Sequence, residues 1–134
     1  MEVATSTEEA NKRAYVFPGQ GSQSVGMGTE LFESSRAARE TFEEADDSLG
    51  FPLSRLIFEG PAQGLQNTAN SQPAIMTMSV AAWRTWQEMQ GPEAMNAKAV
   101  AGHSLGEYTS LVAADVIDFS DAVKLVRRGG ELMN

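Results

Sequence analysis

The sequence predicts an α/β fold in which a parallel sheet is flanked by helices. Residues 14–17 form a short apolar run typical of a buried strand, and residues 98–101 form a second strand-like run. Helical patterns lie between and after them. With 134 residues and 42% hydrophobic content, the chain is long enough for one small domain with a core. Only two strands are evident, so we expect the sheet to be incomplete in this chain.

The N-terminal part of the chain contains the first strand and a loop. Residues 1–12 are polar and are expected to form a flexible extension, which leaves residues 13–134 for the domain. The strand over 14–17 ends at a Pro-Gly pair. Residues 19–23 read Gly-Gln-Gly-Ser-Gln and therefore predict a loop.

Helical patterns follow. Over residues 29–49, apolar residues recur at spacings of four, three and four, which places them on one face of a single helix. Apolar residues within 53–57 suggest a short helical turn before a Gly-Pro pair.

Two later helices are expected. Ser71 or Gln72 should lie near the cap of the first of these, with the following proline in its first turn. Its run over 74–90 is apolar on most sides, so we expect it to be largely buried. The last helix should start near Asp118 or Ser120.

Residues 102–106 read Gly-His-Ser-Leu-Gly, a G-x-S-x-G pattern between the second strand and a helix expected over 107–114. A serine at a sharp strand-to-helix turn exposes its hydroxyl to a substrate. The free N–H groups at the start of the helix can stabilise an oxyanion. Ser104 is therefore the candidate nucleophile. The alternative is an ordinary glycine-rich turn whose serine only caps the helix.

The loops after the two strands open at the same edge of a parallel sheet, where binding sites form. Acyl transfer through a serine needs two hydrogen-bond donors aimed at the developing oxyanion. The strand-to-helix turn over residues 102–106, called the serine elbow below, offers the N–H of Leu105. The loop over 19–23 offers a second N–H, with Gln20 central in it.

Three motifs occur in order: Phe-Pro-Gly-Gln-Gly-Ser-Gln at 17–23, Ser-Gln-Pro-Ala at 71–74 and Gly-His-Ser-Leu-Gly-Glu-Tyr at 102–108. Together they resemble the successive signatures of malonyl-CoA:acyl carrier protein transacylases, here of the discrete bacterial type, and of the related domains of polyketide and fatty acid synthases. The resemblance implies an α/β-hydrolase-like large subdomain, of which residues 13–134 would be the N-terminal part.

The resemblance implies a ping-pong acyl transfer in fatty acid biosynthesis. Ser104 would accept the malonyl group from malonyl-CoA and pass it to the phosphopantetheine thiol of acyl carrier protein. Gln20 and Leu105 would supply the oxyanion-hole N–H groups, and Gln72 would line the pocket. A helix cap is an equally good interpretation of Gln72. No metal or other cofactor is expected.

Two features depart from the family pattern. The family takes its histidine base from a segment far beyond the elbow, whereas the single histidine here, His103, adjoins the serine. Side chains of neighbouring residues at a tight elbow point apart, so we interpret His103 as a structural or substrate-site residue. We expect these 134 residues alone to be nearly inactive, with a complementing C-terminal segment as a candidate partner.

The second departure concerns the acyl pocket. The family's carboxylate-binding arginine lies in a helix that resembles residues 125–133, and an ungapped alignment places Gly129 at its position. A guanidinium binds a carboxylate through two hydrogen bonds, which glycine cannot do. Arg128, about 100° away on a regular helix, is the candidate substitute. Either the acyl specificity is altered, or Arg128 compensates, or the residue was changed.

The composition disfavours other classes. A net charge of −8 opposes binding to nucleic acid or to an anionic membrane surface. The sequence has no apolar run of about 18 residues and no targeting segment, so a cytoplasmic protein is expected. Without cysteine it has no thiol nucleophile.

Two alternatives to a transferase are open. A serine esterase or thioesterase of the α/β-hydrolase type would share the elbow, but it needs a glycine-rich oxyanion motif and a histidine after the serine. The sequence has neither. The other alternative is a non-catalytic fragment that binds its missing half or acyl carrier protein.

Overall fold

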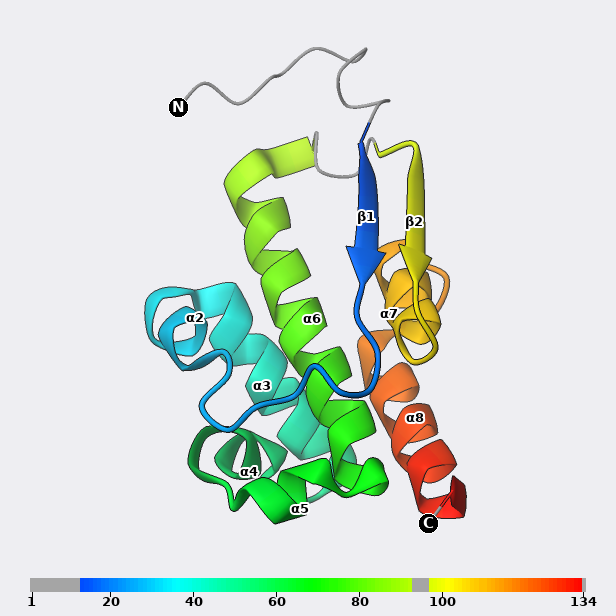
Figure 1. Ribbon diagram of the computed structural model, residues 1–134. Coiled ribbons are helices and arrows are strands. Elements are labelled where there is room, and N and C mark those ends of the chain that lie inside the picture. The colour runs from blue at the N-terminus through cyan, green and yellow to red at the C-terminus, as the bar shows by residue number, and fades with distance from the viewer. Residues whose placement is uncertain (1–12, 93–96, 134) are drawn as a thin grey trace.

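The computed structural model describes residues 13–92 and 97–133 (Figure 1). In chain order, its elements are β1 (Ala14–Phe17), α2 (Thr29–Ser34), α3 (Arg36–Leu49), α4 (Leu53–Glu59), α5 (Ala62–Gln66), α6 (Thr68–Gln90), β2 (Ala99–Gly102), α7 (Gly106–Ala113) and α8 (Phe119–Met133). The two strands pair in parallel. The predicted α/β fold, a parallel sheet with flanking helices, is confirmed. The extension predicted over residues 1–12 lies outside the described residues.

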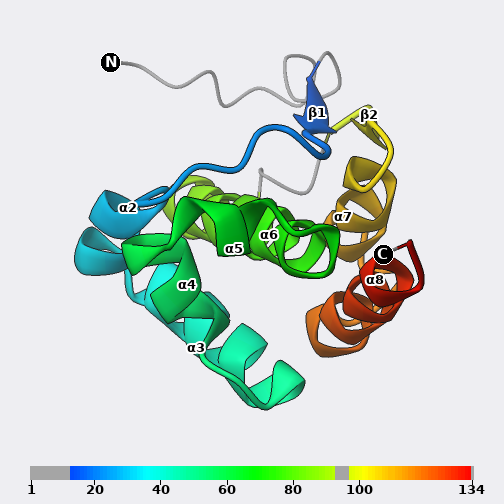
Figure 2. The ribbon, with the colours of Figure 1, turned by 60° about the horizontal axis from the view of Figure 1, so that its bottom comes forward.

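Helix α6 runs through the middle of the molecule (Figures 1 and 2). Helices α2, α3 and α4 lie on one side of it, and the sheet with α7 and α8 lies on the other. The two strands are placed where the sequence predicts them, to within one residue. The carboxyl ends of both strands therefore lead into loops at one edge of the sheet.

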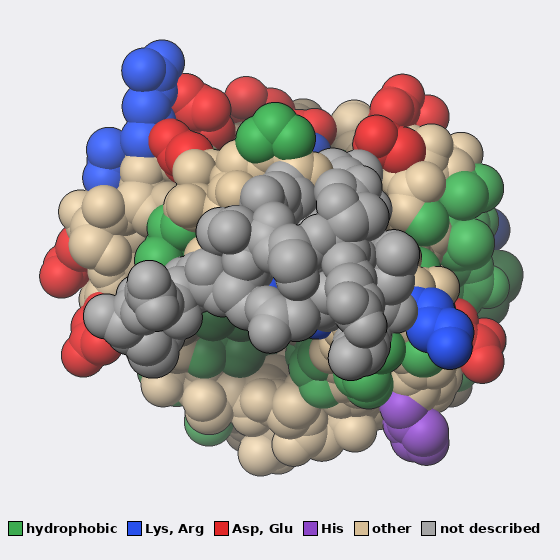
Figure 3. All heavy atoms as spheres, turned by 90° about the horizontal axis from the view of Figure 1, so that it is seen from above, with side chains coloured by type: hydrophobic (Ala, Val, Ile, Leu, Met, Phe, Trp, Pro, Cys, Tyr) green, Lys and Arg blue, Asp and Glu red, His purple; other side chains and the backbone are tan. Residues whose placement is uncertain are grey.

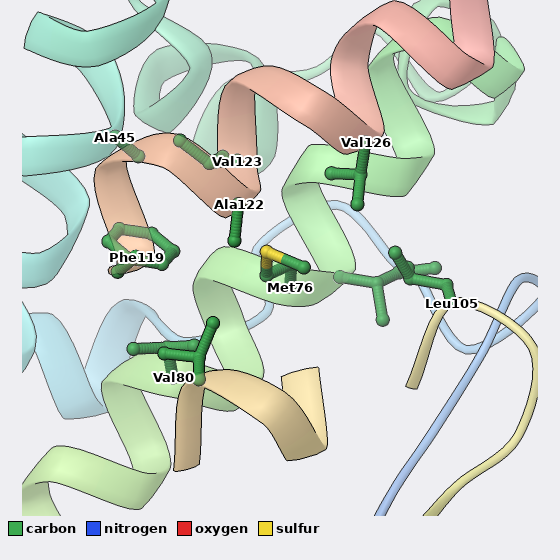
Figure 4. Packing of buried hydrophobic residues seen from close by; sticks show 10 residues of the cluster. Ala45, Met76, Val80, Leu105, Phe119, Ala122, Val123 and Val126 are labelled. Carbon is green, nitrogen blue, oxygen red and sulfur yellow. The ribbon is translucent and has the colours of Figure 1, made fainter. Parts of the chain in front are cut away.

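The main core forms where α8 crosses α6 (Figure 4). Met76 and Val80 of α6 belong to the same cluster as Phe119 and Val126 of α8, and each of the four is buried. Leu105, from the turn before α7, is buried in the same cluster. Burial of one such side chain stabilises the fold by about 1.5–3 kcal/mol. The turn that carries Ser104 is therefore anchored in the core by the residue that follows it.

The segment over residues 29–49 forms two helices, so the prediction of a single helix is wrong. Ser35 separates them with an extended backbone, at φ −121° and ψ 123°. Its hydroxyl accepts a hydrogen bond from the N–H of Ala38 at 3.1 Å, as an N-cap residue does. The predicted apolar face is confirmed, since Ala38, Phe42 and Ala45 of α3 are buried.

The start of α6 also differs from the prediction. The cap is Asn67, whose side chain accepts from the N–H of Ala69 at 3.0 Å, so neither Ser71 nor Gln72 is the cap. Pro73 consequently lies inside the helix, where it lacks the N–H that would bind the Ala69 carbonyl. That carbonyl instead accepts a hydrogen bond from Nη1 of Arg127 in α8, at 2.8 Å. A contact between two helices thus compensates for the proline, which sequence spacing alone could not reveal.

Among the helices of residues 13–92 and 97–133, none is both long and apolar enough to cross a membrane. The cytoplasmic location expected from the sequence stays a prediction.

Candidate active site

The turn between β2 and α7 holds Ser104 in an unusual backbone conformation. Its φ is +53°, in the left-handed region that side-chain-bearing residues seldom adopt. Ser104 is exposed, whereas Leu105 beside it is only 2% exposed. Such backbone strain persists only where the surrounding structure enforces it, and it is frequent at functional sites. The turn therefore presents the serine hydroxyl and buries the residue behind it.

Close backbone contacts explain both glycines of the G-x-S-x-G pattern. A Cβ on Gly102 would lie 1.9 Å from the carbonyl carbon of Gly106, and a Cβ on Gly106 would lie 2.2 Å from the carbonyl oxygen of Phe17. No side chain fits at such distances. Helix α7 starts without a side-chain hydrogen bond at its cap, so the structure does not support the alternative in which Ser104 only caps it.

The loop after β1 packs directly against this turn. A Cβ on Gly19 would lie 2.5 Å from the carbonyl oxygen of His103, and the N–H of His103 donates to the carbonyl of Phe17 at 3.2 Å. The predicted meeting of the two loops at the carboxyl edge of the sheet is thus observed. Within the described residues, the backbone N–H groups of Gln20 and Leu105 donate to no other backbone group.

Gln72 joins the first loop to α6. Its side-chain amide donates to Oε1 of Gln20 at 3.3 Å, and Gln20 in turn donates from Nε2 to Oγ1 of Thr68 at 3.3 Å. Gln72 is only 7% exposed, so most of its side chain is buried at this junction. The helix-cap interpretation of Gln72 is wrong. The structure brings Gln20 and Gln72 into contact, although they lie far apart in sequence.

Gln72 also lines a cavity of about 240 Å³ between α6, α7 and α8. Tyr108 of α7 and the α8 residues Arg128 and Gly129 line it as well. Two of the predicted substrate-site residues, Gln72 and Arg128, therefore share one cavity. Sequence reasoning did not single out Tyr108, although its position one helical turn after Ser104 was a usable signal.

The arginines of α8 share one carboxylate. Arg128 donates from Nη1 to Glu131 at 3.3 Å, and Arg127 donates from Nε to the other oxygen of Glu131 at 3.1 Å. The hydrogen bond from Arg128, followed by that from Arg127, lowers the pKa of the Glu131 carboxyl. The sequence analysis did not single out Glu131. This residue is hydrogen-bonded to Arg128, the side chain that the sequence predicts to bind the malonyl carboxylate.

His103 lies apart from this cavity. Its side chain is exposed, and Figure 3 shows the histidine in purple at the surface. It is not among the described residues that line the cavity with Gln72 and Arg128. The structure therefore links His103 to the site through its backbone contacts with the first loop.

Comparisons with known proteins agree with this geometry. A family profile described as acyl transferase domain matches residues 14–134. The malonyl CoA-acyl carrier protein transacylase of Bacillus subtilis (strain 168) is 50% identical over 124 residues, which are 92% of this chain and 38% of that protein. The chain thus spans well under half the length of this curated relative.

Two solved structures have the same arrangement. The acyl carrier protein S-malonyltransferase from Vibrio cholerae superposes with a TM-score of 0.83 at 48% identity, over 90% of this chain and 38% of that one. The structure of a type II PKS acyl-carrier protein in complex with its malonyl-transacylase matches with a TM-score of 0.85 at 47% identity, over 92% of this chain and 39% of that one.

Proposed function

Because the chain belongs to the family of acyl transferase domains, we propose that it carries the nucleophile of a malonyl-CoA:acyl carrier protein transferase. The observation that carries this proposal is the strained, exposed Ser104 at φ +53°, held by glycines against the loop that contains Gln20. The names of the relatives support the same reaction, since they transfer malonyl groups to acyl carrier protein.

In the first half-reaction, the Ser104 hydroxyl attacks the thioester carbonyl of malonyl-CoA and loses its proton to a base. The carbon–sulfur bond breaks, and coenzyme A leaves as a thiol after taking up that proton. In the second half-reaction, the phosphopantetheine thiol of acyl carrier protein attacks the serine ester, and the proton returns to Ser104. Two transfers with moderate barriers replace one with a high barrier.

The N–H groups of Gln20 and Leu105 would stabilise the oxyanion in both steps. Removal of one such donor typically costs about 3 kcal/mol of barrier height. Gln72 would hold the Gln20 side chain and so fix the loop that supplies the first donor. Arg128 would face the acyl group across the cavity that it shares with Gln72.

Within the described part of the chain, His103 is the only histidine that could act as the base. His103 is exposed and adjoins Ser104 at a tight turn, so it is badly placed to take the serine proton. Loss of a general base lowers the rate of such enzymes by several orders of magnitude. We therefore expect these residues alone to turn over very slowly, and a C-terminal segment that supplies a histidine would complement them.

Mass spectrometry of the peptide that contains Ser104 tests the proposal. After long incubation with millimolar malonyl-CoA, we expect a malonyl adduct on Ser104 in the natural chain. In the Ser104→Ala variant, that peptide should stay unmodified. Equal modification of the variant would contradict the role of Ser104. Hydrolysis of a simple ester with no transfer to acyl carrier protein would favour the esterase alternative.

A further inference from the structure

The cavity beside α8 has the size and position of a short acyl pocket. At about 240 Å³ it is smaller than the roughly 300–1,000 Å³ that drug-sized ligands occupy. Gln72 lines it and also binds Gln20 of the first loop. Tyr108 lines it from the first turn of α7, directly after the serine elbow. These two residues connect the cavity to the loop that contains Gln20 and to the helix that follows Ser104.

The lining of this cavity is mostly apolar. Leu125, Val126, Leu132 and Met133 supply most of the α8 wall. Arg128 is the one cationic residue among the described residues that line the cavity. Apolar walls favour an uncharged occupant, because a carboxylate loses hydration there unless a cation replaces it.

Arg128 does not provide a free cation. Its guanidinium is hydrogen-bonded to Glu131 at 3.3 Å, and its side chain is 69% exposed to solvent. A substrate carboxylate in the cavity would have to compete with the carboxylate of Glu131, which already accepts a hydrogen bond from Arg128. The net charge of −8 adds a repulsive field for any extra negative charge on the substrate.

Gly129 leaves an open place in the wall. A Cβ at this position would meet no atom within 4 Å, whereas a Cβ on the adjacent Gly130 would lie 2.8 Å from the backbone of Thr68 and Ala69. Packing therefore demands a glycine at 130 but not at 129. At 129, glycine provides room in the cavity and no group that could bind a carboxylate.

From these observations we propose that the acyl pocket discriminates little between malonyl and uncharged short acyl groups, so that the site accepts short acyl thioesters as a class. This inference rests on the proposed function, since it concerns the substrates of that same site. Two residues account for the weak preference for a carboxylate. Gly129 provides no group that binds one, and Glu131 occupies the guanidinium of Arg128.

Calorimetric binding to the Ser104→Ala chain, which cannot be acylated at that position, tests the inference. Malonyl-CoA is compared with 3-methylbutanoyl-CoA, in which two methyl groups replace the carboxylate oxygens, and free coenzyme A serves as the reference. We expect dissociation constants for the two thioesters that agree within about threefold. A preference for malonyl-CoA of about tenfold or more would overturn the inference while leaving the proposed function intact.

The Gly129→Arg substitution, added to Ser104→Ala, should create a preference for malonyl-CoA over 3-methylbutanoyl-CoA. A guanidinium in the open place can bind the malonyl carboxylate, so we expect a shift toward malonyl-CoA of about tenfold or more. Gly129→Met is the matched control, since it adds bulk without charge and should produce no such shift. An unchanged ratio in the arginine variant would show that the cavity does not hold the acyl group and would overturn the inference. Binding of neither thioester more tightly than coenzyme A to any of these chains would contradict the proposed function itself.

Discussion

Glycines stand at the serine elbow and on the cavity side of α8, but in opposite surroundings. At the elbow, Gly102 and Gly106 have backbone atoms within 2.5 Å of where a Cβ would be, and so does Gly19 in the loop that packs against it. On α8, Gly129 has no atom within 4 Å of that place. The same residue type is thus dictated by packing in one region and unconstrained by packing in the other. The elbow can therefore vary little without loss of the fold, whereas a side chain at position 129 meets no steric obstacle.

Helix α8 shows the same contrast between a side that packs tightly against α6 and a side that lines the cavity. Arg127 and Gly130 face α6, where one supplies a hydrogen bond to the Ala69 carbonyl and the other permits close approach of the two backbones. Arg128 and Gly129 line the cavity. Neighbouring residues in the sequence therefore serve the fold and the site separately.

The largest effect is expected for Gly106→Ala at the elbow. A methyl group 2.2 Å from the Phe17 carbonyl oxygen must push β1 and α7 apart, so we expect a loss of about 3 kcal/mol or more in the free energy of unfolding. Urea denaturation followed by circular dichroism measures this loss. A variant as stable as the natural chain would mean that the close approach of α7 to β1 is not real.

A smaller effect is expected for Arg127→Met, which removes the hydrogen bond to the Ala69 carbonyl and the contact with the Phe51 ring at 4.8 Å. A buried acceptor left without a partner costs about 1–3 kcal/mol. In a Pro73→Ala background, the restored N–H can bind that carbonyl, so the same substitution should cost less. A double-mutant cycle by chemical denaturation measures the coupling. Additive effects would show that the arginine does not compensate for the proline.

The smallest effects separate the adjacent glycines of α8. Gly129→Ala should stabilise the chain by up to about 1 kcal/mol, because alanine has the better helix propensity and meets open space. Gly130→Ala should destabilise it by about 1–2 kcal/mol, because its Cβ would lie 2.8 Å from the Ala69 Cα atom. Thermal unfolding of both variants should shift the melting temperature in opposite directions. Shifts of the same sign would remove the distinction between the two sides of α8.

The features that the sequence predicts well are local. The strands, the elbow turn and the starts of α7 and α8 depend on neighbouring residues and were predicted to within about two residues. The break at Ser35 was missed because the periodic apolar residues, Ala38 to Leu49, all follow it and carry no information on the segment before it, although Ser is a common N-cap residue. Helix α5 (Ala62–Gln66) was also missed, since it is a short helix with one buried residue and too little periodicity to detect.

In the candidate site, too, the locally determined features could be predicted and the contacts between distant residues could not. Ser104 and the loop with Gln20 could be found from motifs, because glycine patterns report backbone conformation directly. The bond between Gln20 and Gln72 and the pairing of Arg128 with Glu131 depend on distances between side chains. No spacing rule predicts the first of these, because α6 must first be placed against the loop.

The central claim is that Ser104 is an acyl acceptor and that residues 13–92 and 97–133 hold no base placed to take its proton. The most direct measurement is the rate at which malonyl-CoA modifies Ser104, followed by peptide mass spectrometry with and without added imidazole as an external base. We predict slow modification that imidazole accelerates in the natural chain, and no modification of that peptide in Ser104→Ala. No adduct on Ser104 even with imidazole would contradict the claim that it is the acceptor. Rapid, complete modification without imidazole would contradict the claim that the base is missing.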